Sequence, residues 1–335
     1  MDASFQLQRV RRKVARLLDP PQPVAEPVDH ASPIPPGPRP ADRYLEFPQL
    51  AEHDKLTLPW PVQPQPGYVG QLDAQYQAVQ RALRADFGPE HGHWYHETAL
   101  PDGQHIRGAW NLVGQERQYI GSLDVAGRRI IEFGPATGHL SVWLTYQGAD
   151  VVAFDAGLDR CIDLLTYEAA DLEPLCQQAM ALIGRVQNSW WWLTSQWGVT
   201  VPAVYGEIYD LPKDLGVFDV SFFGAILLHL RDPYQALYQA SRITTSQIVV
   251  TDVIPPGHTD LDEDYSEFNP AFGDGSSWCR LSAKRIVRML STMGFADCTV
   301  QRHYQFIRPN HDIDKDFNPV EYFTVVANRT APLPA

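Results

Sequence analysis

The feature that most constrains this chain is a regular alternation of short apolar runs with helical segments, which begins near residue 126. The runs are rich in β-branched and aromatic residues, which is typical of buried strands. They are Arg129–Phe133, Val151–Phe154, Ala203–Tyr205, Phe218–Gly224 and Gln247–Asp252. Strands that alternate with helices form a parallel sheet covered on both faces, so we expect a doubly wound α/β fold.

The end of the chain predicts a change of direction in this sheet. Residues Ser282–Met293 show apolar positions at helical spacing, with Ser282 as the expected N-cap and Gly294 as the stop. Two further strands are expected at Ala296–Arg302 and Glu321–Asn328. Together with the five runs they predict a seven-stranded, mostly parallel, Rossmann-like sheet with an antiparallel C-terminal strand.

Three segments precede the domain that we place at residues 126–330. Residues 1–18 have the spacing of a basic amphipathic helix, which we interpret as a docking or dimerisation arm or as an anchor to an anionic surface. Residues 19–40 contain nine prolines and are expected to form an extended linker or strap. Residues 41–125 are interpreted as an N-terminal helical cap, with a helix expected at Asp73–Ala85.

The most informative motif is a glycine-containing loop between the first predicted strand and the helix that follows it. It reads Glu132-Phe133-Gly134-Pro135-Ala136-Thr137-Gly138-His139. Glycine lets the backbone turn tightly and approach a ligand, and this position between strand and helix gives the motif its meaning. The loop lacks the Gly-x-Gly-x-x-Gly form typical of dinucleotide sites and the Lys-Ser/Thr ending of a P-loop.

A carboxylate closes the second predicted strand, at Asp155 in the run Val151–Asp155. In doubly wound folds a carboxylate at this position accepts hydrogen bonds from a ribose diol. The alternative is a helix N-cap, because Asp155 also begins the next segment.

Residues 128–155 resemble the cofactor half of class I S-adenosylmethionine-dependent methyltransferases, and the resemblance continues through residues 206–212 and 218–233. It implies S-adenosyl-L-methionine as cofactor, with Glu207 receiving the adenine amino group and Ile208 packing on the ring. It also implies that Gly224 ends the strand that borders the methyl group. The full set of implied cofactor-binding residues is Glu132, Gly134, Pro135, Gly138, His139, Asp155, Ala156, Glu207, Ile208 and Gly224.

A narrower resemblance links the chain to the tRNA wobble-uridine methyltransferase-like branch of that family. It rests on the segment Ser277–Ser282, on the lead-in Trp94–Trp110 and on the fourth-strand motif. Members that use a carboxymethylated cofactor carry a tyrosine before the fourth-strand histidine, whereas Leu228 precedes His229 here. This departure favours ordinary S-adenosylmethionine and a different substrate.

Candidate catalytic residues come from two places. His229 follows the fourth strand, where a histidine can act as general base or can simply begin a helix. Tyr95 and His96 belong to a polar cluster in the cap that could close over the site. The link between the second and third strands adds Trp190-Trp191-Trp192, either as packing residues or as an aromatic wall for a planar or cationic group.

The composition of the chain limits the kinds of binding partner that we expect. The formal net charge is -13, which disfavours nucleic acid because its binding depends heavily on phosphate neutralisation. The four cysteines are far apart and form no C-x-x-C pair, which argues against zinc and against a disulfide framework, so no metal is expected. We see no membrane span and no signal peptide, so a reducing cytoplasm is the simplest location.

These observations lead to a main hypothesis and three alternatives. The main one is methyl transfer from S-adenosylmethionine to an oxygen or nitrogen of a small-molecule substrate, by an enzyme for which the N-terminal region suggests a homodimer. One alternative is internal cyclisation or lyase chemistry on S-adenosylmethionine that releases methylthioadenosine. The others are a tRNA uridine-modifying methyltransferase and a non-catalytic module that binds the cofactor.

Overall fold

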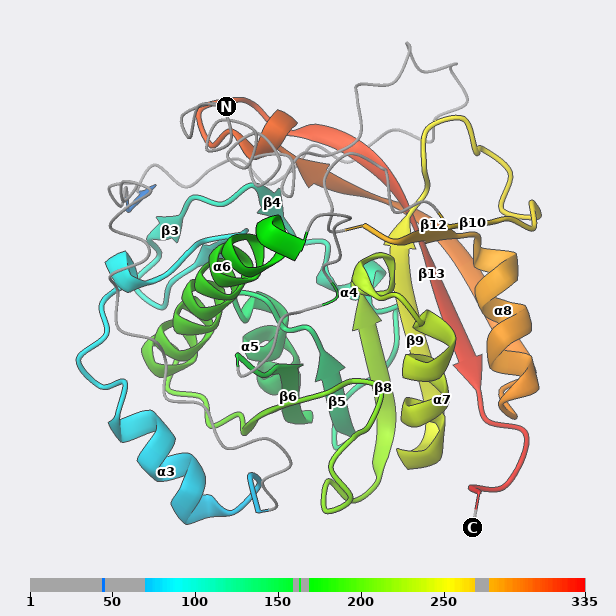
Figure 1. Cartoon of the computed structure of the whole chain (residues 1–335), viewed down its shortest axis with the longest axis horizontal. Coiled ribbons are helices and arrows are strands. Elements are labelled where there is room, and N and C mark those ends of the chain that lie inside the picture. The colour runs from blue at the N-terminus through cyan, green and yellow to red at the C-terminus, as the bar shows by residue number, and fades with distance from the viewer. Residues whose placement is uncertain (1–43, 46–69, 159–162, 164–168, 269–276, 335) are drawn as a thin grey trace.

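The computed structural model describes residues 44–45, 70–158, 163, 169–268 and 277–334, and a mostly parallel sheet lies at its centre (Figure 1). Seven strands form the core of that sheet. In spatial order they are β7 (Ala203–Gly206), β6 (Asp150–Ala156), β5 (Arg129–Phe133), β8 (Phe218–Gly224), β9 (Thr244–Val253), β13 (Asn318–Asn328) and β12 (Asp297–Ile307). The five from β7 to β9 are parallel, and β13 is antiparallel to both β9 and β12. The doubly wound prediction with an antiparallel C-terminal strand is confirmed.

Four short strands from the cap region extend the same sheet to eleven strands. They continue from β12 as β4 (Trp110–Asn111), β2 (His96–Ala99), β3 (His105–Ile106) and β1 (Tyr44–Leu45). In the described part of the region, the helices are α3 (Ala74–Ala82), α4 (Glu116–Tyr119) and the 3-10 turn η1 (Pro89–His91). The predicted arm at residues 1–18 and the linker at 19–40 lie outside the described residues.

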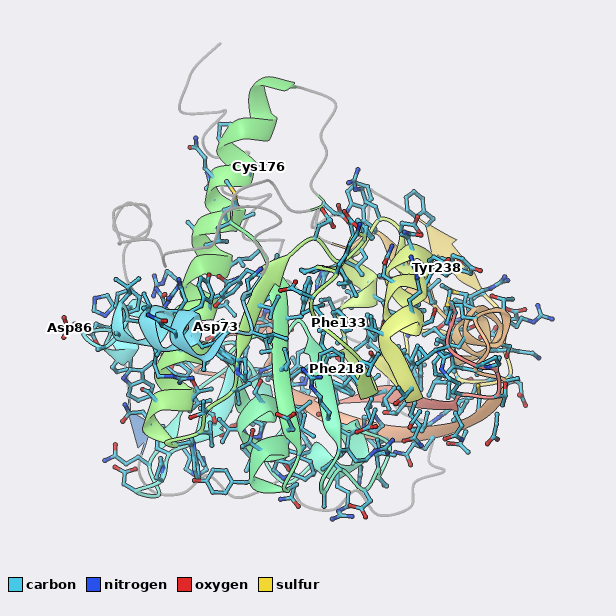
Figure 2. The ribbon with its side chains drawn as sticks, turned by 90° about the horizontal axis from the view of Figure 1, so that it is seen from below. Asp73, Asp86, Phe133, Cys176, Phe218 and Tyr238 are labelled. Atoms are coloured by element: carbon cyan, nitrogen blue, oxygen red, sulfur yellow. The ribbon has the colours of Figure 1, made fainter. Side chains whose placement is uncertain are left out.

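Helices cover both faces of the sheet because its strands are apolar on both faces. On β5, for example, Ile130 packs into the core beneath α5 (His139–Tyr146) and α6 (Ala169–Gln196). Its neighbour Ile131 packs into the core beneath α7 (Pro233–Ile243) and α8 (Ala283–Thr292). Successive side chains of a strand point to opposite faces, so one apolar run serves two cores. Figure 2 shows Phe133 and Phe218 in the packed middle of the sheet, with Tyr238 on α7.

The ends of the predicted elements shift by a few residues. The C-terminal helix begins after Ser282, whose hydroxyl accepts the backbone N–H of Arg285 at 3.0 Å, and Gly294 follows it at φ 87°. A small hairpin of β10 (Ser266–Phe268) and β11 (Cys279–Leu281) precedes it, and 3-10 turns lie at η2 (Leu227–His229) and η3 (Pro309–His311).

Helix α6 packs its tryptophans onto the sheet. Trp190 and Trp191 are 2% and 3% exposed, and the Trp191 indole donates to the Tyr205 hydroxyl at 2.7 Å. Of the two interpretations of these residues, packing is therefore the one that the structure supports. The N-terminal part of α6, which carries Cys176, projects beyond the sheet (Figure 2). Cys176 is disulfide-bonded, which the cysteine spacing did not predict, although it argued only against a disulfide framework.

Glutamine side chains from the segment at α3 cover the edge strand β7. Gln77 accepts the N–H of Ala203 at 3.0 Å and donates to the Ala203 carbonyl at 2.7 Å. Gln71 does the same for Tyr205, at 2.8 Å and 2.9 Å. Both glutamines are buried, and they satisfy backbone groups that an exposed edge would offer to another strand. Among the described residues, no helix is both long and apolar enough to cross a membrane.

Candidate cofactor site

The glycine loop lies at the carboxyl end of the central strand β5. Gly134 and Gly138 have φ values of 69° and 87°, in the left-handed region that favours glycine. The N–H of Gly138 donates to the Pro135 carbonyl at 2.9 Å, which closes the turn before α5 begins at His139. The N–H of Gly134 donates to the Phe154 carbonyl at 2.9 Å, so the loop lies directly beside the end of β6.

Both glycines also lie in close contact with side chains. A Cβ atom at Gly138 would lie 2.7 Å from Trp190 Cδ1, and one at Gly134 would lie 2.5 Å from Ile226 Cδ1. The sequence therefore needs glycine here for two reasons, the backbone conformation and the close approach of neighbouring elements.

We expect Gly138→Ala to lower the free energy of unfolding by about 2 to 4 kcal/mol, because left-handed strain adds to overpacking against Trp190. The matched control is Gly103→Ala, since Gly103 has φ 81° but no atom within 4 Å of the added Cβ. Urea denaturation of both variants would separate the two contributions. Equal losses of unfolding free energy at the two positions would show that the contact with Trp190 does not contribute to the destabilisation.

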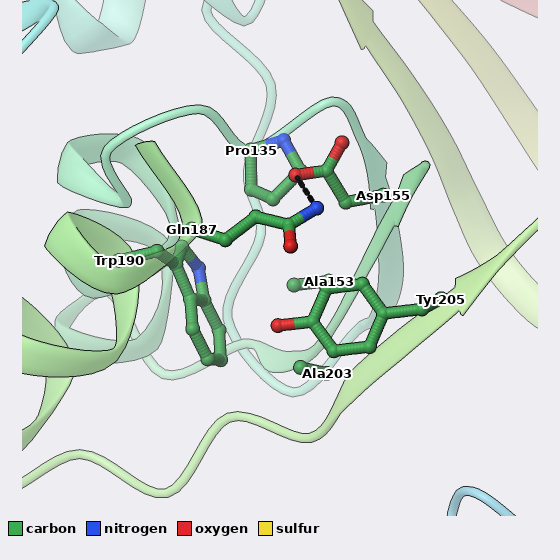
Figure 3. Close-up of a pocket in the computed structure, with 7 residues that line it drawn as sticks. All are labelled: Pro135, Ala153, Asp155, Gln187, Trp190, Ala203 and Tyr205. Atoms are coloured by element: carbon green, nitrogen blue, oxygen red, sulfur yellow. Dashed lines mark hydrogen bonds between the residues drawn. The ribbon is translucent and has the colours of Figure 1, made fainter. Parts of the chain in front are cut away.

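The carboxylate of Asp155 is held beside the loop by backbone and by α6. Its Oδ1 accepts the N–H of Ala156 at 2.8 Å, and its Oδ2 accepts from the Gln187 amide at 3.2 Å. The same amide also donates to the Ala156 carbonyl at 2.9 Å. Figure 3 shows Gln187 reaching from α6 to Asp155 across a small pocket. The pocket has room for about one water molecule and is lined by Pro135, Ala153, Asp155, Gln187, Trp190, Ala203 and Tyr205.

Burial makes both acidic groups of this site weak acids. It raises the pKa of Asp155 to about 6, against the lowering effect of the hydrogen bonds from Ala156 and Gln187. Burial likewise raises the pKa of Glu132 to about 7, and the charge of Asp155 adds to the shift. The Ser141 hydroxyl donates to Glu132 and in turn accepts the Trp190 indole N–H at 3.1 Å. The site thus holds two carboxyl groups that are easily protonated near neutral pH.

The cap region contacts the loop through His96. The backbone N–H of His96 donates to Thr137 Oγ1 at 3.3 Å, and its Nδ1 lies 3.2 Å from the same oxygen. Burial lowers the pKa of His96 to about 3, with a further contribution from the charge of His139. A neutral imidazole of this pKa is a poor proton acceptor, which disfavours His96 as a general base. Tyr95 packs edge-on against His96, with ring centroids 5.0 Å apart.

The side chain of His139 is occupied by structural contacts. Its Nε2 lies 2.8 Å from Glu116 Oε1 and its Nδ1 lies 3.0 Å from Thr98 Oγ1, in a buried setting. Only the backbone of His139, at the start of α5, is left to face a ligand at the loop. The contact also ties α4 and β2 to α5.

The remaining predicted residues follow β7 and β8. Glu207 comes directly after β7 and accepts the Tyr209 N–H at 3.3 Å, while Ile208 packs partly against the core. Gly224 ends β8, and a Cβ there would lie 2.8 Å from the Tyr119 hydroxyl. His229 is exposed on η2, just beyond that strand. Ligands of doubly wound sheets bind at the carboxyl ends of the strands, which is the edge where these residues lie.

Sequence reasoning missed Gln187 and Tyr119, because neither belongs to a motif and both come from segments far from the loop. Tyr119 lies on α4 and Gln187 on α6. Within the described ranges, no group of three His, Cys, Asp or Glu side chains is placed to hold a metal ion.

Comparisons with known proteins give only distant likenesses. No family model matches the sequence, and no curated protein matches it. Among solved structures, the N-terminal domain of EvdMO1 with SAH bound is 14% identical with TM-score 0.42, covering 76% of this chain and 97% of that chain. The Burkholderia thailandensis 1,6-didemethyltoxoflavin-N1-methyltransferase is 13% identical with TM-score 0.40, covering 86% and 94%. The YcgJ protein from Bacillus subtilis is 12% identical with TM-score 0.43, covering 65% and 99%. Likenesses this distant do not assign an activity to this chain.

Proposed function

We propose that this chain binds S-adenosylmethionine and transfers its methyl group to an oxygen or nitrogen of a small-molecule substrate. The observation that carries the proposal is the juxtaposition of the left-handed glycine loop with Asp155. The two lie on adjacent strand ends, joined by the hydrogen bond from Gly134 to the Phe154 carbonyl at 2.9 Å. A loop that exposes backbone and a half-buried carboxylate beside it fit an amino acid carboxylate and a ribose diol.

In this proposal each residue has a defined part. The loop and the start of α5 hold the methionine end, Asp155 accepts the ribose hydroxyls, and Glu207 with Ile208 contacts the adenine. When bound, S-adenosylmethionine supplies a methyl group that is already activated by the sulfonium. The protein then mainly has to align the nucleophile with that methyl group. A small molecule is favoured over RNA because the net charge of -13 opposes a phosphate backbone.

The test has two steps. Calorimetry with S-adenosylhomocysteine measures whether the protein binds the nucleoside, and absence of binding would refute the whole proposal. Mass spectrometry of the protein incubated with S-adenosylmethionine alone then asks which bond reacts. Methylthioadenosine appearing without any second substrate would replace methyl transfer by chemistry on the cofactor itself. An intact cofactor is the result that we expect.

Gln187 is predicted to set the pH range in which the cofactor binds. Its amide lowers the pKa of Asp155, so Gln187→Leu should raise that pKa further above its ordinary value. Because ribose binding uses the ionised carboxylate, the acid limb of S-adenosylhomocysteine binding should move to higher pH. Affinity should approach that of the original protein at alkaline pH.

Calorimetry across a pH series measures this shift. Gln196→Leu, at the exposed end of the same helix, is the matched control and should leave the profile unchanged. A loss of affinity that is the same at every pH would contradict an effect through Asp155 and would indicate a direct or purely steric role for Gln187.

A further inference from the structure

Three tyrosines gather on one face of the sheet, at the edge where the proposed cofactor residues lie. Tyr119 and Tyr322 belong to the core beneath α5 and α6, and Tyr95 packs against the same core. A Cβ atom at Gly224 would lie 2.8 Å from the Tyr119 hydroxyl, so this hydroxyl lies against the end of β8. Tyr322 is paired with Val253, the last residue of the adjacent strand β9. Two of the three tyrosines are therefore fixed beside the strand end that is proposed to border the methyl group.

Tyr95 connects this group to the glycine loop. Its ring centroid lies 5.7 Å from that of Trp110, whose ring stands edge-on to Tyr322 at 5.3 Å. The next residue, His96, contacts Thr137 of the loop through its backbone N–H and its ring. We call the four aromatic side chains on this face the aromatic wall: Tyr95, Trp110, Tyr119 and Tyr322. The aromatic wall extends from the glycine loop to the end of β8.

The hydroxyls of the aromatic wall are open to a ligand. Tyr119 and Tyr322 are only 4% and 1% exposed, and Tyr95 is partly exposed. In the described part of the chain none of the three hydroxyls has a hydrogen-bond partner, yet none is sealed from solvent. Hydroxyls of buried side chains are normally hydrogen-bonded, so three open ones at one place indicate an opening into which they can bond a ligand.

The aromatic wall and the histidines beside it carry no charge near neutral pH. His303 lies next to the rings of Tyr119 and Tyr322, with centroids 6.3 Å and 6.0 Å away. Burial lowers the pKa of His303 to about 4 and that of His96 to about 3, so both imidazoles are neutral. Burial also raises the pKa values of Tyr95 and Tyr119, so both phenols keep their protons. These groups can exchange neutral hydrogen bonds but cannot pair with an ion.

We propose that the aromatic wall binds the substrate of this protein, and that this substrate is a neutral aromatic alcohol of the phenol class. The inference rests on the proposed function and specifies its substrate. The wall rings would contact a flat substrate ring edge-on or offset, and the Tyr119 hydroxyl would bond the substrate hydroxyl beside Gly224. The carboxylate of Asp252 points to the opposite face of the sheet from its neighbour Val253, so the wall offers no partner to an ammonium group.

The first experiment compares p-cresol with 4-methylcyclohexanol, which has the same substituents on a saturated ring. Calorimetry is carried out in the presence of saturating S-adenosylhomocysteine. The protein should bind p-cresol about 10-fold more tightly, because only the aromatic ring gains edge-to-face contacts with the wall. Equal affinities for the two ligands, or binding of neither, would overturn the assignment.

The second experiment removes one hydroxyl from each side of the proposed hydrogen bond. Tyr119→Phe should weaken p-cresol binding about 3- to 10-fold and leave toluene binding unchanged, because toluene has no hydroxyl. The variant should fold normally, since the lost hydroxyl has no partner among the described residues. Tyr238→Phe is the matched control, because Tyr238 is 41% exposed on α7, and it should change neither affinity.

Equal weakening of p-cresol and toluene by Tyr119→Phe would contradict the hydrogen bond to Tyr119. Tighter binding of 4-hydroxybenzoate than of p-cresol would contradict a neutral substrate. If S-adenosylhomocysteine itself fails to bind, the proposed function is refuted. If it binds and p-cresol does not, only this inference is refuted, so the two failures are distinguishable.

Discussion

Replacing Asp155 by alanine is expected to weaken the binding of S-adenosylhomocysteine by more than about 100-fold. Each hydrogen bond from a ribose hydroxyl to the carboxylate contributes about 1.5 to 3 kcal/mol, and two of them are lost together. The measurement is calorimetry at about pH 8, above the raised pKa of Asp155, where the carboxylate is ionised. At lower pH the difference between the two proteins should shrink, because the original protein also loses its ionised acceptor.

The control for this prediction lies on the same strand. Asp150 begins β6, at the end away from the loop, and its side chain is 71% exposed. Asp150→Ala removes an equal charge without touching the site, so it should leave affinity unchanged. An Asp155→Ala variant that binds as tightly as the original protein would remove Asp155 from the site.

The core of the fold could be predicted because burial on both faces leaves a strong pattern. Phe218–Gly224 was predicted residue for residue as β8, since apolar side chains face both helical layers. Helix α7 (Pro233–Ile243) likewise has a strong local start signal, because Asp232 caps it and Pro233 is its first residue. Such signals lie in a few neighbouring residues, so they can be recognised without knowledge of the rest of the chain.

The extension of the sheet by the cap region could not be predicted. Strands β3 and β4 contain two residues each, too few to show the alternation that identifies a strand. Their pairing is determined by partners that are distant in sequence, such as Ile307 of β12 opposite Trp110. The 28-residue helix α6 was not predicted for another reason. Pro174 lies inside it, and a proline usually ends a helix.

The candidate site likewise contains residues that the sequence could predict and residues that it could not. The glycine loop and Asp155 were visible because they are contiguous with strands, whereas Gln187 reaches Asp155 from 32 residues further along the chain.

The second large effect concerns the joint between the cap strands and the main sheet. Arg308 follows β12 and its guanidinium lies 2.9 Å from Glu97 of β2, with side chains only 7% and 4% exposed. We expect Glu97→Ala to lower the free energy of unfolding by about 3 to 5 kcal/mol, because it leaves a buried guanidinium unpaired. Urea denaturation measures the loss. The exposed pair Arg129–Asp150 is the control, and Asp150→Ala should cost less than about 1 kcal/mol.

Removing Arg308 instead of Glu97 should give the free energy of unfolding a different pH dependence. In an Arg308→Met variant, Glu97 loses the group that opposes the burial-driven rise of its pKa, so it should take up a proton well above its ordinary pKa. Its folded state then binds more protons than the unfolded chain, so its stability should recover as the pH falls. A guanidinium cannot change its charge in this way, so the stability of the Glu97→Ala variant should show no such recovery across the same range. Identical pH profiles for the two variants would mean that Glu97 is not the group whose burial is costly.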